Sequence, residues 1–140
     1  MPSNYDPKRP DETVFRTPYP ELIEAYRASD VFISTSYIES FNTAALDAFA
    51  CGRPVLITNT QGFMDVLEEG INGFSVPPRD PAAVAEKLVN LARHRDLCRR
   101  MGESARNVAA KFDWSIMVKD YLRVYEQARS HKSPAPKPTT

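Results

Sequence analysis

Apolar residues follow two different rhythms along the chain, and each rhythm predicts a different element. Short runs rich in apolar and β-branched residues occupy positions 31–35, 55–58 and 74–76. Longer stretches with apolar residues three or four apart lie between and after these runs. The short runs predict buried strands, and the longer stretches predict helices. Strands that alternate with helices in this way predict parallel βαβ units and an α/β fold.

Helical stretches between the predicted strands cover residues 21–29, 43–51 and 63–69. After the last strand the chain is helical throughout, in three predicted helices. Asp80 is a suitable N-cap with Pro81 in the first turn, so the first of the three is expected to begin there. The third has the strongest apolar stripe in the chain, which predicts packing rather than a cofactor site. Its members are Trp114, Met117, Val118, Tyr121, Leu122 and Tyr125.

The chain has 140 residues, which is enough for one domain. Residues 1–13 are polar and contain three prolines, so we expect a flexible leader there. Residues 14–129 are expected to form the folded domain. Its parallel sheet has three strands, or four if residues 14–15 add a short one. Residues 130–140 are rich in proline, serine and lysine, which predicts a disordered tail.

Charge and composition argue against several classes of function. The 18 basic and 18 acidic residues cancel, so the net charge does not favour nucleic acid or a membrane surface as a partner. No apolar run approaches the length of a transmembrane helix. Cys51 and Cys98 are widely spaced in helical stretches, which predicts free thiols in a reducing compartment. The expected location is the cytoplasm, with a peripheral position at the inner face of the membrane as an alternative.

The sequence offers no pattern that would hold a cofactor. His94 and His131 stand alone, so there is no cluster with metal-ligand spacing. A glycine-rich phosphate loop of the usual form is also missing from the sequence. We therefore predict no metal and no cofactor.

The most informative stretch is residues 37–54. A polar turn carrying Glu39 follows the predicted strand, Asn42 is a suitable N-cap, and Gly52 followed by Pro54 predicts the helix end. The helix between them is apolar nearly all round, which predicts burial. Asp47 is its only charged residue.

A lone acid on a buried helix needs a partner or an opening to solvent. Asp47 therefore has two interpretations that the residues alone leave equal. In the first it pairs with a structural group. In the second it faces a cleft at the carboxyl end of the strand, where open α/β sheets bind ligands. The free N–H groups at the helix start would then face an anion, and Glu39 and Asp47 would accept hydrogen bonds from hydroxyl groups.

Residues 39–55 read Glu-Ser-Phe-Asn-Thr-Ala-Ala-Leu-Asp-Ala-Phe-Ala-Cys-Gly-Arg-Pro-Val. This segment resembles the Glu-x7-Glu signature of retaining GT-B glycosyltransferases of the family 4, or group 1, type. The flanking segments 21–32 and 70–81 resemble the same family, and the likeness extends over about residues 13–127. Two residues depart from the family pattern. Asp47 replaces the second Glu and is shorter by one methylene, and Asn42 replaces a frequent Gly but tolerates positive φ.

The resemblance implies a partial Rossmann-like fold, corresponding to part of the GT-B C-terminal domain, and a role for each matching residue. Glu39 would be the first acidic residue of the signature, a catalytic residue that lies beside the donor sugar and its phosphate. The segment Ser40, Phe41, Asn42 and Thr43 would contact sugar and diphosphate through backbone N–H groups. Asp47 would hold the ribose hydroxyls. The implied reaction transfers a hexosyl unit from a UDP-, GDP- or ADP-sugar to an acceptor hydroxyl with retention, without a metal.

Relative to that family, the chain lacks the N-terminal acceptor domain and the first half of the C-terminal domain. The missing half carries the Arg and Lys that neutralise the donor diphosphate. We expect millimolar or weaker donor binding by this chain alone, because a few hydrogen bonds barely exceed the cost of association. It would be a fragment of a longer enzyme, a subunit completed by a partner chain, or a decayed copy.

Two other functions remain open at this point. The chain could be a non-catalytic Rossmann-like remnant that acts as an interaction or regulatory subunit, or a βαβ protein of unrelated function. Without the missing half, the strand at 31–35 would lie at an open edge of the sheet. Exposed edges pair with other chains, so self-association is expected.

Overall fold

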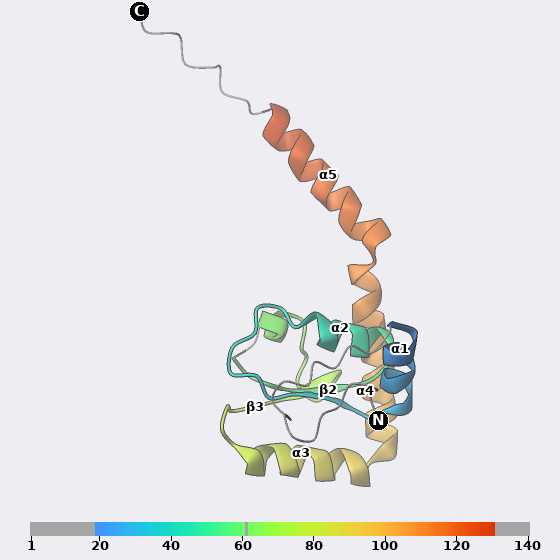
Figure 1. Cartoon of the computed structure of the whole chain (residues 1–140), viewed down its shortest axis with the longest axis vertical. Helices are drawn as coiled ribbons and strands as arrows, with labels where there is room; N and C mark the ends of the chain where they lie inside the picture. The colour runs from blue at the N-terminus through green and yellow to red at the C-terminus, as the bar shows by residue number, and fades with distance from the viewer. Residues whose placement is uncertain (1–18, 61, 131–140) are drawn as a thin grey trace, which may run out of the picture.

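A computed structural model describes residues 19–60 and 62–130, and the described residues form a three-stranded parallel sheet with helices around it (Figure 1). The strand order is β1 (Phe32–Ser34), β2 (Val55–Thr58) and β3 (Gly73–Val76). Every residue of β2 is buried, because this central strand is covered on both faces. The predicted α/β fold and its short parallel sheet are confirmed.

Several predictions fall outside the described residues. These are the leader at 1–13, the strand at 14–15 and all of the tail except Ser130, which ends the last helix. Among the described strands, β1 lies at one edge of the sheet, as predicted for the strand at 31–35.

The helices cover both faces of the sheet. Helices α1 (Tyr19–Ala28) and α2 (Thr43–Ala50) lie on one face, and α3 (Pro81–Arg93) lies on the other (Figure 1). Helix α4 (Arg95–Ala109) passes from the α3 side to the α2 side. Its early residues join the core under α3, and Ala105 joins the core under α2. Two hydrophobic cores therefore share the sheet as their common wall.

The helix predicted over 63–69 is wrong. Only a single 3-10 turn, η2 (Gly62–Asp65), forms there. Beyond it, the side chain of the fully buried Asn72 binds backbone groups of the segment. Its amide oxygen accepts a hydrogen bond from Glu68 N at 2.8 Å, and its amide nitrogen donates to Val66 O at 3.1 Å. A side chain that competes for backbone groups in this way replaces helix with a closed loop.

The predicted start and apolar face of α3 are confirmed. The Asp80 side chain accepts a hydrogen bond from Ala83 N at 2.9 Å, and Pro81 occupies the first turn. Leu91 is buried, and Val84 and Leu88 pack against the same core.

The last helix, α5 (Trp114–Ser130), follows the 3-10 turn η3 (Ala110–Phe112) and extends away from the rest of the protein (Figure 1). The helix is confirmed, but its predicted packing is wrong. None of its residues is buried, and Trp114 is 76% exposed. Periodicity shows that a helix has an apolar face. It does not show that the surface covering this face belongs to the same chain.

Candidate functional site

The segment between β1 and α2 lies at the carboxyl end of the sheet and is tied to the turn after β2. The Thr58 hydroxyl donates to Ser36 O, and Gly62 N donates to Glu39 O at 3.1 Å. A Cβ atom at Gly62 would lie 1.7 Å from Ser40 O, so only glycine allows this approach. The two loops therefore hold each other, and the backbone around Glu39 has a defined position.

Glu39 is half-buried at this loop. One of its carboxylate oxygens accepts a hydrogen bond from Ser40 N at 3.2 Å. Within residues 19–60 and 62–130, no cation forms an ion pair with it. The carboxylate thus keeps most of its capacity to accept further hydrogen bonds.

The start of α2 is capped as predicted. Asn42 is buried in the left-handed conformation with φ 61°, and its side-chain oxygen accepts from Ala45 N at 3.2 Å. Thr43 and Ala44 also belong to the first turn, where N–H groups have no intrahelical acceptor. The helix ends before Gly52, which has φ 71° as predicted.

The Phe41 ring is not free to meet a ligand. It packs against the rings of Phe63 and Phe112, with centroids 5.6 and 5.7 Å away. Of the predicted loop contacts, that of Phe41 is therefore limited to its backbone, whereas Ser40 and Thr43 are exposed. The ring packing anchors the loop to η2 and η3.

Asp47 lies one turn into α2, on the face that also carries Thr43. It is half-buried, and burial raises the pKa of its carboxyl above the ordinary value. In the part of the chain that the structure describes, the carboxylate has no ion pair or hydrogen bond. The structural-pairing interpretation of Asp47 therefore has no support.

A hollow of about 530 Å³ adjoins Asp47, between α2 and the end of α4. Arg106 and Trp114 also line it, without an ion pair to Asp47. Glu39 and residues 40–43 do not line this hollow. The structure therefore places the two acids on either side of the first turn of α2, but the described residues do not enclose them in one cavity.

A second cleft, of about 360 Å³, lies at the carboxyl ends of the strands on the α3 side. This cleft was not predicted from the sequence. Arg79 lines it with φ 62°, and its guanidinium lies 5.3 Å from the centre of the Tyr37 ring. A signal was present in the sequence, because Arg79 stands between a strand-ending Pro-Pro pair and the N-cap of a helix.

Both cysteines are buried free thiols, as predicted. The Cys98 thiol donates to Asp30 O at 3.2 Å, and burial raises its pKa, so it is a poor nucleophile. In the described residues no three His, Cys, Asp or Glu side chains gather to hold a metal ion. No helix there combines the length and the apolar character needed to cross a bilayer.

Comparison with solved structures identifies the class of fold. The sucrose-phosphate synthase of Thermosynechococcus elongatus matches 84% of this chain with TM-score 0.78 and 27% identity, over 30% of that chain. Anabaena HepE in complex with UDP matches 76% with TM-score 0.67 and 25% identity, over 29% of that chain. The fold is that of part of a GT-B glycosyltransferase C-terminal domain.

Sequence comparison identifies the family. The glycosyl transferases group 1 family matches residues 11–108, which is most of the chain, and the chain belongs to that family. The D-inositol 3-phosphate glycosyltransferase of Corynebacterium jeikeium is 40% identical over 115 residues, covering 81% of this chain and 27% of that protein. The Frankia alni enzyme of the same name is 37% identical over 118 residues, covering 83% and 29%. The chain thus spans about a quarter of the length of these relatives.

Proposed function

We propose that the chain is the donor-side part of a retaining glycosyltransferase, which transfers a hexosyl unit from a nucleotide-sugar to an acceptor hydroxyl. The single observation that carries this proposal is the segment from Glu39 to Asp47. It folds as a fixed loop, a capped helix start and one further turn, with a carboxylate at each end that no described cation pairs. Family membership and the UDP bound to the structural relative HepE support a nucleotide-sugar donor.

Each residue of the segment has a proposed role. Glu39 is the first acidic residue of the signature, a catalytic residue that lies beside the donor sugar and its phosphate. The backbone of Ser40, Phe41, Asn42 and Thr43 meets sugar and diphosphate, since the first N–H groups of a helix attract anions. Asp47 accepts hydrogen bonds from the ribose hydroxyls. The base of the donor is uracil, guanine or adenine, and neither nucleic acid nor a cofactor takes part.

A partner completes this site, either the N-terminal GT-B portion or a separate chain that carries it. Two unprotected surfaces support this proposal. The apolar stripe of α5 is exposed, and β1 forms an edge of the described sheet with Ile33 41% exposed. Without its partner the chain self-associates through that edge. We place the protein in the cytoplasm, with the inner face of the membrane as the alternative.

The proposal is tested by reconstitution. The chain is mixed with the N-terminal three quarters of a relative, and transfer from UDP-, GDP- and ADP-sugars is measured. Glu39→Ala abolishes transfer, whereas Asp47→Glu keeps or raises donor affinity. Asp65→Ala, at an exposed acid of η2, is the matched control and leaves transfer unchanged. Weaker donor binding after Asp47→Glu would remove Asp47 from the ribose site.

The alternative function is a non-catalytic interaction or regulatory subunit. It is favoured because Arg106 is the one described cation that lines the hollow beside Asp47, and a diphosphate carries more charge than one guanidinium offsets. A complex that forms with the N-terminal portion but neither hydrolyses nor transfers any nucleotide-sugar would support it. Self-association is measured separately by light scattering, where a monomer at high concentration would contradict edge pairing.

A further inference from the structure

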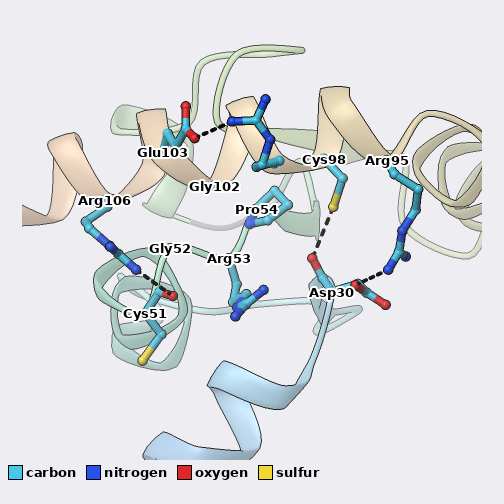
Figure 2. A pocket seen from close by; sticks show the side chains of 11 residues that line it. Asp30, Cys51, Gly52, Arg53, Pro54, Arg95, Cys98, Gly102, Glu103 and Arg106 are labelled. Carbon is cyan, nitrogen blue, oxygen red and sulfur yellow. Dashed lines mark hydrogen bonds and ion pairs between the residues drawn. The ribbon is translucent and has the colours of Figure 1, made fainter.

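A cleft of about 370 Å³ lies at the amino ends of β1 and β2, at the opposite end of the sheet from Glu39 (Figure 2). One wall is the turn from α2 into β2, and the other is α4. The floor is closed by direct backbone packing, because a Cβ atom at Gly102 of α4 would lie 2.1 Å from Gly52 O. The family resemblance assigns no function to this end of the sheet.

Four arginines and two acids line the cleft, but they are not equivalent. Arg95 pairs with Asp30 at 2.9 Å (Figure 2), and Arg99 pairs with Glu103 at 2.7 Å. Within each of these two pairs, the opposite charges neutralise each other. The remaining cations are Arg53 and Arg106, for which the described residues supply no ion-pair partner.

Arg53 and Arg106 make only single hydrogen bonds to backbone oxygens. An Arg53 terminal nitrogen donates to Arg27 O at 2.5 Å, and an Arg106 terminal nitrogen donates to Cys51 O at 3.3 Å. A guanidinium has five N–H donors, so most donors of both side chains remain available. The Arg53 Nε atom is buried and has no partner in the described protein. A buried donor without an acceptor is unfavourable, so a small movement of the Arg53 side chain toward a ligand oxygen would be favoured.

The helix ends at this cleft reduce the positive charge without cancelling it. Arg27 lies in the last turn of α1 and Cys51 caps the end of α2, so both helices direct their carboxyl ends here. Each helix end carries about −0.5 charge. Against the two unpaired guanidinium groups, a net charge of roughly +1 therefore remains.

The Arg106 guanidinium packs against Gly52. A Cβ atom at Gly52 would lie 2.7 Å from its terminal nitrogen, so the glycine leaves the space that the guanidinium occupies. In Figure 2, Arg106 extends from α4 to the end of α2 at Cys51, and Arg53 extends from the turn before β2 toward the end of α1. Two arginines that line one cleft offer it several N–H donors, and the oxygens of a phosphate group accept paired hydrogen bonds from such donors.

We propose that this cleft binds a phosphate group through Arg53 and Arg106. The phosphate belongs either to a soluble phosphate compound or to a lipid headgroup. The site lies at the opposite end of the sheet from Glu39 and shares Arg106 with the hollow beside Asp47. It does not depend on the proposed transfer reaction.

The experiment titrates the full chain with inorganic phosphate and pyrophosphate at constant ionic strength, and follows the arginine Nε–H signals by NMR. The Arg53 signal shifts saturably with either anion. Arg53→Gln and Arg106→Gln each weaken pyrophosphate binding about tenfold, as expected when a charged hydrogen-bond donor is lost. Arg100→Gln is the matched control, since Arg100 is exposed on α4 outside the cleft, and it changes binding less than twofold.

A second arm distinguishes the two sources of phosphate. Sedimentation with phosphatidylcholine vesicles, with and without phosphatidylglycerol, tests the lipid. Retention that needs Arg53 and is competed by pyrophosphate assigns a headgroup phosphate, whereas pyrophosphate binding without retention assigns a soluble compound.

Three results would overturn the site. The first is the absence of a saturable Arg53 shift in the wild-type chain, which does not depend on how any variant folds. The second is an equal shift produced by sodium chloride. The third is an equal loss of binding in Arg100→Gln. Thermal unfolding of each variant identifies loss of fold, and Arg53→Lys then provides a variant that retains the charge.

Discussion

Strand β2 and helix α5 are built from similar apolar residues but lie in opposite surroundings. Leu56 of β2 is completely buried in the core between the sheet, α3 and the first part of α4. Leu122 of α5 is 55% exposed, on a helix without a single buried residue. Isolated helices of this length are marginal in water, because most helical stability in proteins comes from packing. The apolar residues of β2 are therefore covered by the described residues themselves, whereas α5 has the composition of a helix that packs against something else.

Helices α3 and α5 show the same contrast at equal periodicity. Leu91 of α3 is buried against the sheet, and its stripe has a matching surface in Leu56 and Phe74. The stripe of α5 has no such surface among residues 19–60 and 62–130. The chain spans only about a quarter of its relatives, so a covering surface outside the chain agrees with the proposed partner.

The largest expected effect is the difference between a buried and an exposed leucine. Leu56→Ala lowers the free energy of unfolding by about 2–5 kcal/mol, because it removes contacts and leaves a cavity. Leu122→Ala changes it by less than about 0.5 kcal/mol in the isolated chain. Urea denaturation followed by circular dichroism measures both. An equal loss in the two variants would mean that α5 is packed in solution.

The next effect concerns the contact between α4 and the end of α2. Replacing glycine by alanine inside a helix normally stabilises it by about 1 kcal/mol. Gly102→Ala does the opposite and destabilises the protein by about 1–3 kcal/mol, since the new Cβ meets Gly52 O. Ser104→Ala in the same helix is the control and remains nearly neutral. A stabilising Gly102→Ala in thermal unfolding would show that α4 moves away easily.

A smaller difference in stability is expected between loss of the N-cap of α3 and loss of the N-cap of α5. Asp80→Ala lowers the free energy of unfolding by about 1 kcal/mol, because it removes the cap of the packed helix α3. Asp113→Ala reduces only the helical circular dichroism signal and leaves the unfolding midpoint of the residues before α5 unchanged. A shifted midpoint would show that the stability of the residues before α5 depends on α5.

The same cap gives α5 a pH dependence. Hydrogen bonds from the Ser115 hydroxyl and backbone N–H hold the pKa of Asp113 below its ordinary value. The cap is therefore complete above the ordinary aspartate pKa and is lost as the pH falls through the lowered value. Helicity of α5 should decrease there in the wild-type chain but not in Asp113→Ala. The two proteins are compared by circular dichroism across acid pH.

The smallest effect is expected at Asp47. Burial raises the pKa of its carboxyl, so the ionised form is disfavoured in the folded protein. Its contribution to stability is present below the ordinary aspartate pKa and is lost as the pH rises through the raised value. Asp47→Asn should therefore stabilise the chain at neutral pH and not at low pH. Asp65→Asn is the exposed control, and a stabilisation that persists at low pH would assign the effect to something other than ionisation.

The sequence predicted those features that neighbouring residues decide. The cap at Asn42, the left-handed Gly52 and the start of α3 at Pro81 all depend on local backbone chemistry. The central strand was predictable because it is a short, uninterrupted apolar run. The loop after η2 was not predictable, because buried Asn72 takes backbone groups that a helix would have used.

The candidate site divides in the same way. The order of Glu39, Asn42 and Asp47 along the chain placed the acids around one helix start. That no described residue pairs with Asp47 could not be predicted, since any partner would come from a distant element. The cleft that Arg53 and Arg106 line was also not predicted, because these residues are far apart in sequence and line one cleft only where α4 crosses the end of α2.

The sequence by itself therefore determined the α/β alternation, the helix caps and the family signature, since each depends on residues within a few positions of one another. Only the tertiary structure decided which apolar stripe is covered, which charges remain unpaired and where clefts form. These properties depend on segments distant in the chain that share one volume and exclude water from it, and burial is a property of that arrangement rather than of any single segment.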